Sequence, residues 1–179
     1  MTRIDVCTTR EPDAWMRALE SCVPYDFYHL PQYHAIAEEA GEGAAHLFHY
    51  TEGDYTLALP LLLRSLEGLP LTQPVGACWR DATSVYGYPG PICSHREIPA
   101  AIARNFQAGL RGWLRDLRVV TVFSRLHPFF SPHTLLSGLG ECQVTQTVSI
   151  DLTLSSAEQR ASYRKSNKEA INKLRRLGL

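Results

Sequence analysis

The sequence predicts a mixed α/β (α+β) domain in which helices flank a mixed β-sheet. Segments whose apolar residues alternate are interleaved with segments whose apolar residues recur every three or four positions. Glu52-Gly53-Asp54 separates two apolar runs and has the composition of a hairpin turn. Long helices are predicted near the start and at the end of the second half of the chain. Strands and helices mixed in this way are typical of α/β or α+β layers.

The first part of the chain carries signals for one strand, two short helices and a hairpin. Residues 3–8 alternate in polarity and predict a strand. Pro12 and Pro31 each suit the first position of a helix, and Gly41 suits the end of the second one. The predicted helices span residues 12–22 and 32–40, the hairpin strands span residues 44–51 and 55–64, and a Pro- and Gly-rich loop follows over residues 68–80. Pro60 predicts an edge position or a bulge in the second hairpin strand.

The second half predicts a helix between two strands. Residues 98–117 have an apolar stripe at helical spacing, with arginines off that stripe. Residues 119–126 are mostly apolar, and we expect them to form a strand in the middle of a sheet. Residues 142–154 alternate in polarity and predict the last strand, which leads into a basic helix.

The basic helix is predicted over residues 155–179, after a domain spanning residues 1–154. Ser155 and Glu158 have the spacing of a capping box, and Gly178 suits a C-terminal cap. Residues 160–179 contain seven basic residues and one acidic residue, Glu169, which gives a net charge of +6. Residues 1–159 contain 11 Arg and 17 acidic residues, which gives a net charge of −6. This charge predicts that the helix contacts an acidic partner, which could be the rest of the chain or a phosphate-bearing ligand. The alternative is that the basic residues form a solvated face of the helix.

Composition limits the class of protein. The chain has 179 residues, 45% of them apolar, which suits one globular domain, and no apolar run approaches the roughly 20 residues of a membrane span. The N-terminus lacks the apolar core of a signal peptide, so we expect a cytoplasmic protein. The five cysteines have no CxxC spacing and predict reduced, mostly buried thiols and no metal site. Because the chain ends just past a helix cap, we expect it to be a fragment of a longer protein.

Three motifs are candidates for ligand binding, each with a structural alternative. Residues 25–33 combine four aromatic rings with a His and an Asp, which could line a pocket or pack at a helix entry. In residues 84–91, two Tyr separated by Gly, Tyr86 and Tyr88, precede a Pro-Gly-Pro turn, and the backbone N–H groups of Gly87 and Gly90 could form an anion-binding nest or belong to a rigid turn. Arg125 and His127, two apart at a predicted strand end, could hold a carboxylate or phosphate oxygen, or Arg125 could close the loop on one acid.

Taken in order, several stretches resemble the Fem aminoacyl-transferases, a group that includes FemAB-like enzymes with tandem GNAT folds. The stretches are HLPQYH, VYGYPGP, FSRLHP, and the run from VSIDLTLS into YRKSNKEAINKLRRLGL. The resemblance covers most of residues 25–179 and depends on the ordered set. It implies that this chain is the first of two GNAT-like halves, with the basic helix leading to a second one.

The resemblance also implies a function. Fem enzymes transfer an amino acid from aminoacyl-tRNA to a peptidoglycan precursor, and relatives use other acyl donors in surface polysaccharide or lipid assembly. In such proteins the first half helps to bind the acceptor, and a basic residue on the linking helix can meet its diphosphate. That residue is commonly an Arg three positions before an Ile, and here Lys168 stands in that place. The implied acceptor is a phosphorylated sugar or a lipid-linked precursor. The implied binding residues are Tyr86, Gly87, Tyr88, Gly90, Arg125, His127, Arg164, Lys165 and Lys168.

Neither a donor site nor a catalytic residue can be assigned from the sequence. No acetyl-CoA loop with a Gln/Arg-x-x-Gly-x-Gly/Ala pattern is present, so no cofactor is expected in this part. The full-length protein would use acyl-CoA or aminoacyl-tRNA, and we expect this half alone to be inactive. A peripheral position at the inner membrane surface and a homodimer through the face around Ile171, Leu174 and Leu177 are further expectations.

Two other function classes are compatible with the sequence. The chain could be a non-catalytic scaffold that presents the basic helix to a catalytic GNAT domain. It could also bind nucleic acid, with tRNA as the candidate, although the negative charge of residues 1–159 opposes that hypothesis.

Overall fold

The computed structural model describes residues 1–67, 79–130 and 134–178, and these form two units, Met1–Gln143 and Val144–Leu179. Most of the predicted loop over residues 68–80, including Cys78, lies outside the described residues. The other four cysteines are free thiols, three of them buried, as the sequence predicted. None of the described helices is long and apolar enough to cross a bilayer.

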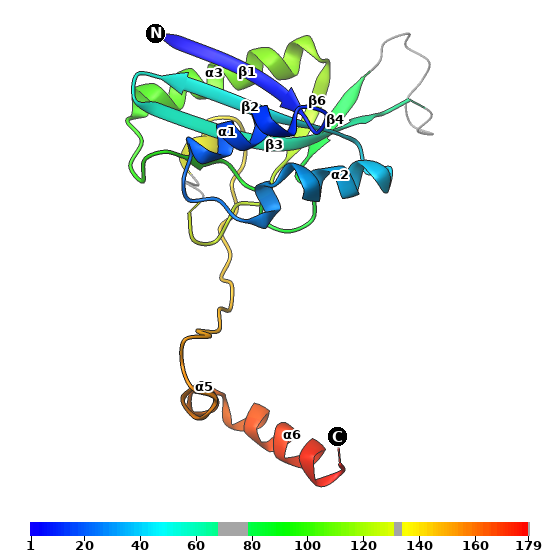
Figure 1. Cartoon of the computed structure of the whole chain (residues 1–179), viewed down its shortest axis with the longest axis vertical. Helices are drawn as coiled ribbons and strands as arrows, with labels where there is room; N and C mark the ends of the chain where they lie inside the picture. The colour runs from blue at the N-terminus through cyan, green and yellow to red at the C-terminus, as the bar shows by residue number, and fades with distance from the viewer. Residues whose placement is uncertain (68–78, 131–133, 179) are drawn as a thin grey trace. The chain divides into compact units, whose positions relative to one another are not determined.

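The first unit is built on a six-stranded mixed sheet with the order β1-β2-β3-β4-β6, with β5 paired to β3 (Figure 1). Neighbouring strands are antiparallel except β4 and β6, which are parallel and lie on either side of helix α3 in the sequence. The strands are β1 (Thr2–Thr8), β2 (Ala44–Glu52), β3 (Tyr55–Ser65), β4 (Arg80–Thr83), β5 (Ile92–Cys93) and β6 (Val119–Phe123). A mixed sheet flanked by helices confirms the predicted fold class and is consistent with a GNAT-like domain.

Helices cover both faces of this sheet. Because side chains alternate along a strand, β3 directs Ala58 and Leu62 into one core and Leu57, Leu59 and Leu61 into the other. The first core packs against α1 and α2, and the second packs against α3. The helices of the first unit are α1 (Pro12–Glu20), the 3₁₀ turn η1 (Phe27–His29), α2 (Pro31–Glu39), α3 (Ala100–Asp116) and the short α4 (Thr134–Ser137).

Two strand predictions are wrong in their details. Pro60 lies in a central strand and not in an edge strand, because β3 pairs with β2 on one side, from Tyr55 to Leu63, and with β4 and β5 on the other. On the side of β3 away from β2, Pro60 lies between the segment that pairs with β5 and the segment that pairs with β4. Its missing N–H therefore interrupts neither the pairing with β5 nor the pairing with β4. Strand β6 was expected in the middle of the sheet. Within the described residues it is an edge strand, and its Val120 and Phe123 are each 56% exposed.

The predicted last strand over residues 142–154 is not formed. This stretch has no described strand partner, and its apolar side chains are exposed, for example Val148 at 97% and Leu152 at 82%. An alternating sequence becomes a strand only when another strand satisfies its backbone groups. The alternation of polarity is present in this stretch, but the pairing that a strand requires is absent from the described structure.

The predicted basic helix is present as two helices. α5 (Ser156–Ser162) begins with the predicted capping box of Ser155 and Glu158, and α6 (Lys165–Arg176) is followed by Gly178 at φ +77°. Tyr163 and Arg164 between them have extended backbone angles and form a corner. Lys168 Nζ donates to the carbonyl of Ala161 at 2.8 Å, which satisfies one of the terminal carbonyls of α5.

A buried histidine in α2 makes the fold sensitive to acid. His34 is fully buried beside Trp15, and its Nδ1–H donates to the Leu30 carbonyl at 3.0 Å. Its Nε2 has no hydrogen-bond partner in the described structure, and burial lowers the pKa of His34 to about 4. At a pH between the two pKa values, His34 binds a proton in the unfolded chain but not in the folded chain. The folded state therefore loses stability as the pH falls below the pKa of His34 in the unfolded chain, roughly 6.5.

We therefore expect His34 to contribute about 2 kcal/mol to the loss of unfolding free energy between pH 7 and pH 5. Urea unfolding at both pH values measures this loss. The His34→Gln variant should lose less stability over the same interval, even if it is less stable throughout. Wild type unfolded at the same two pH values is the reference, and the difference between the two losses measures the contribution of His34. Parallel pH curves for wild type and His34→Gln would contradict this assignment.

Candidate functional site

Three segments of the first unit converge on one site: the turn before α2, the glycine-containing turn after β4, and the chain that leaves β6. The phenol of Tyr33 donates to the carbonyl of Tyr86 at 3.2 Å and joins the first two segments. The buried Ser84 joins the second and third, because its N–H donates to the Phe123 carbonyl at 2.8 Å and its Oγ accepts from the N–H of Arg125 at 3.2 Å. The sequence motifs around residues 25–33, 84–91 and 125–127 therefore meet in space.

Asp26 is the polar centre of this site. As the N-cap of η1, it accepts the N–H of Tyr28 at Oδ1, at 2.9 Å. Its other oxygen, Oδ2, lies 2.9 Å from Nε2 of His127, about a hundred residues further along the chain. One carboxylate thus caps a local turn and binds a side chain from the third segment.

His127 is held in one tautomer. The N–H of Phe129 donates to its Nδ1 at 3.2 Å, so that nitrogen carries no proton and Nε2–H donates to Asp26. The ring is 8% exposed and stacks on Phe130, with 3.5 Å between ring centroids and 17° between planes. This arrangement corrects the expectation that His127 and Arg125 point together from a strand end: β6 stops at Phe123, and His127 turns inward to Asp26.

His29 completes the polar cluster and is fully buried. Its Nε2–H donates to the carbonyl of Gly90 at 3.2 Å, and its Nδ1 lies 3.1 Å from Oδ1 of Asp26 and 3.3 Å from the backbone nitrogen of the same residue. Burial lowers the pKa of His29, and the charge of Asp26 opposes this effect without cancelling it. Because one ring nitrogen contacts Asp26, the cap of η1, and the other contacts Gly90, His29 acts here as a structural link between η1 and the glycine-containing turn.

An aromatic surface lies over this cluster. Tyr28 packs edge-on against Tyr33 and Tyr88, at 5.8 and 6.0 Å between ring centroids. The ring of Phe27 is tilted by 37° against that of Tyr28, with 4.0 Å between ring centroids. Phe27, Tyr86 and Tyr88 are 53%, 74% and 40% exposed. We define the aromatic surface as Phe27, Tyr28, Tyr33, Tyr86, Tyr88 and Phe123. Several large rings are therefore available to a ligand although the backbone beneath them is fixed.

Gly87 is required by this surface. It has φ +104°, and a Cβ built on it would lie 2.1 Å from Cε1 of Tyr28. The close approach expected at this glycine is thus an approach to the Tyr28 ring. Gly90 is buried, and its carbonyl accepts from His29. These two contacts are compatible with the rigid-turn alternative.

Arg125 supplies the positive charge of the surface. Its guanidinium carbon lies 5.6 Å from the ring centroid of Tyr86 and 5.2 Å from that of Phe123. Both distances are within the range of cation–π attraction. The side chain is exposed, so its forked N–H groups remain open to solvent and to an anionic ligand.

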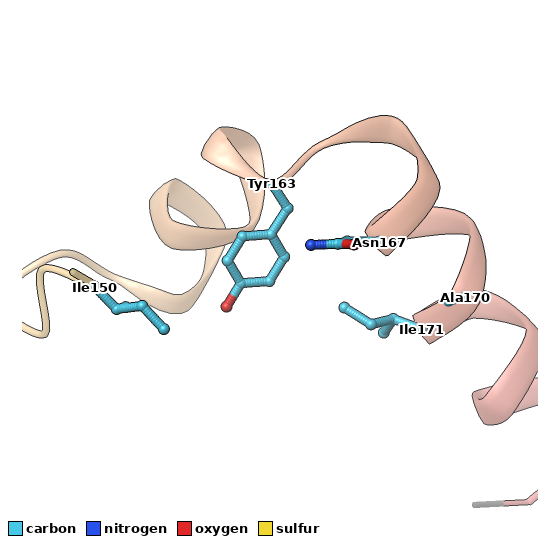
Figure 2. A pocket seen from close by; sticks show the side chains of 5 residues that line it. All are labelled: Ile150, Tyr163, Asn167, Ala170 and Ile171. Carbon is cyan, nitrogen blue, oxygen red and sulfur yellow. The ribbon is translucent and has the colours of Figure 1, made fainter. Parts of the chain in front are cut away.

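The remaining predicted binding residues lie in the second unit. Arg164 is the N-cap of α6, and Lys165 is 91% exposed with Glu169 3.9 Å away, a contact that adds little stability. Lys168 uses one of its three N–H groups on Ala161. This unit also contains an open pocket of about 370 Å³. Figure 2 labels the residues that line it, which are Ile150, Tyr163, Asn167, Ala170 and Ile171.

The segment around residues 25–33 was predicted as a candidate, but Asp26, Tyr28 and His29 were not assigned to the site from the sequence. The available signal was the spacing of Asp26 and His29, which matches a reciprocal cap of a short turn. The contact between Asp26 and His127 carried no local signal because it joins distant parts of the chain.

Comparisons with protein-family models, curated proteins and solved structures found no match to this chain. The functional interpretation therefore depends on the fold class and on the geometry of the site.

Proposed function

We propose that this chain is the acceptor-binding half of a FemAB-like acyltransferase of the tandem GNAT class. Its acceptor would be an amine on a phosphorylated sugar or on a peptidoglycan-type precursor. The observation that carries the proposal is the aromatic surface with Arg125 beside it, built on a domain whose mixed sheet is consistent with a GNAT-like fold. The ordered sequence resemblance to Fem proteins supports the same assignment.

The chemistry of the surface suits a sugar phosphate. Exposed tyrosine rings offer flat apolar faces with a polar edge, which suit the faces and hydroxyl groups of a sugar or a base. The guanidinium of Arg125 can bind two phosphate oxygens at once. Asp26, His29 and His127 hold the backbone beneath these groups, so we assign them positioning roles.

No residue of this half is assigned to the acyl donor. In the proposed full-length enzyme, acyl-CoA or aminoacyl-tRNA would bind to the second GNAT-like domain, and the acceptor amine would be presented to it. The GNAT reaction mainly requires placement of the amine and stabilisation of a tetrahedral oxyanion. This half would help to place the acceptor amine.

Calorimetric titration of the chain with a nucleotide-sugar diphosphate, such as UDP-N-acetylglucosamine, tests the proposal. We expect Tyr86→Ala and Arg125→Gln each to weaken binding about tenfold, because each removes an interaction worth roughly 1–2 kcal/mol. Arg125→Lys should weaken it less, since the charge remains but the fork is lost. Arg104→Gln on α3 removes the same charge from another exposed site and should leave affinity unchanged.

A scaffold half that binds no acceptor is the second candidate. It is favoured by the hydrogen bonds of Asp26 and His29, which are all made within the domain. Affinities that do not differ between wild type, Tyr86→Ala and Arg125→Gln would favour this scaffold function over acceptor binding.

A further inference from the structure

The second unit leaves its apolar side chains uncovered. None of the described residues from Val144 onward is buried. Val148 is 97% exposed, Leu177 is 65% exposed and Leu174 is 49% exposed. So many exposed aliphatic side chains in a short segment indicate a surface that is covered when the protein functions.

Helix α6 separates these apolar residues from its basic ones. With 3.6 residues per turn, Ala170, Ile171, Leu174 and Leu177 occupy one continuous face. The remaining circumference carries the basic side chains, which are Lys165, Lys168, Lys173, Arg175 and Arg176, with Glu169 as the one acidic residue of the helix. This pattern is typical of helices that lie in a membrane interface.

The corner between α5 and α6 extends the apolar face. Figure 2 shows the ring of Tyr163 between Ile150 and the α6 residues Asn167 and Ile171, around the open pocket. Arg160 donates to Asn172 at 2.5 Å and Lys168 donates to Ala161 at 2.8 Å, so the two helices are joined on the other side of the corner. Tyrosine is enriched at the level of lipid headgroups because it combines an apolar ring with a polar tip.

We propose that the second unit binds an anionic lipid bilayer surface, with the apolar face of α6 inserted and the basic residues near the headgroup phosphates. Charge complementarity selects this occupant. A second copy of the same helix would bring together two segments of like charge. Nucleic acid would match the charge but would leave Leu174, Leu177 and Val148 exposed to water. An anionic lipid surface can cover the apolar face of α6 and also bind its basic side chains.

Sedimentation of the full chain with vesicles tests the proposal. We expect binding to vesicles that contain phosphatidylglycerol and much weaker binding to vesicles of phosphatidylcholine alone. Added salt should weaken binding, since charges near a surface are screened within about 10 Å at 0.1 M ionic strength. The Lys173→Gln/Arg176→Gln variant should bind about 25-fold more weakly, because each basic residue near the surface contributes about fivefold.

Two further variants separate the apolar contribution from the general effect of charge. Leu174→Ser/Leu177→Ser keeps every charge and should lose at least about tenfold in binding, because it removes the inserted side chains. Arg104→Gln/Arg115→Gln removes two exposed charges from α3 and should bind as wild type does. Circular dichroism checks that each variant retains its helix content.

The proposal would be overturned by no binding to either vesicle, by equal binding to both, or by an equal loss of binding in the α3 control. It would also be overturned if the chain bound no vesicle but formed a dimer that Leu174→Ser/Leu177→Ser abolishes. The last outcome would assign the face to an interface between copies. Binding of RNA without binding of vesicles would assign the basic residues to nucleic acid and would likewise exclude the lipid surface.

Discussion

Replacing Gly87 with alanine should lower the free energy of unfolding by about 4 kcal/mol. The added Cβ would lie 2.1 Å from Cε1 of Tyr28, and two more atoms of that ring are within 2.8 Å. Such overpacking costs roughly 1–3 kcal/mol, and φ +104° adds a backbone strain of about 1–3 kcal/mol for a residue with a side chain. The Tyr28 ring cannot move far because Phe27, Tyr33 and Tyr88 surround it.

Denaturant unfolding of Gly87→Ala and of a matched glycine variant measures this effect. Gly41 also has positive φ, +77°, but no atom lies within 4 Å of the position that its Cβ would take, so Gly41→Ala should cost only the backbone strain. In the Tyr28→Ala background, Gly87→Ala should be less destabilising because the ring is gone. Equal costs for Gly41→Ala and Gly87→Ala would show that Tyr28 does not limit position 87.

Replacing Asp26 with alanine should destabilise the first unit by about 3 kcal/mol. Loss of the cap to Tyr28 costs roughly 1 kcal/mol. The mostly buried Nε2–H of His127 would also lose its acceptor 2.9 Å away, which costs roughly 1–3 kcal/mol. Because Asp26 joins the first and third segments, the same variant should weaken acceptor binding although it removes no group from the aromatic surface.

The control for Asp26→Ala is Asp13→Ala. Asp13 is an exposed acid in the first turn of α1, so this variant makes the same change of charge but should cost no more than about 1 kcal/mol. Asp26→Asn keeps an oxygen for the cap and should be intermediate. If unfolding shows the same cost for Asp13→Ala and Asp26→Ala, the contact between Asp26 and His127 does not stabilise the fold.

Local signals predicted most elements of the first unit. Pro12 and Pro31 mark the starts of α1 and α2, and Glu52-Gly53-Asp54 marks the turn of the β2–β3 hairpin. The apolar stripe of α3 is buried at Phe106, Leu110 and Leu114. Each of these features depends on residues close together in the sequence, where propensity and periodicity are informative.

The wrong predictions concern pairing. Whether an apolar strand such as β6 lies at an edge, or whether an alternating segment such as residues 142–154 pairs at all, depends on distant segments. The break in the basic helix at Tyr163 and Arg164 has no Pro or Gly signal. In the site, Tyr86 and Arg125 were both predicted as binding residues, but neither their contact nor the contact that turns His127 inward to Asp26 could be found from spacing.

The central claim is that the aromatic surface with Arg125 binds the acceptor. Its most direct test is a ¹H–¹⁵N NMR titration of the chain with UDP-N-acetylglucosamine, which locates the ligand by residue. We predict saturable shifts for Tyr86, Tyr88 and Arg125, and their loss in Arg125→Gln. Shifts confined to other parts of the chain, or no shifts at any ligand concentration tested, would contradict the claim.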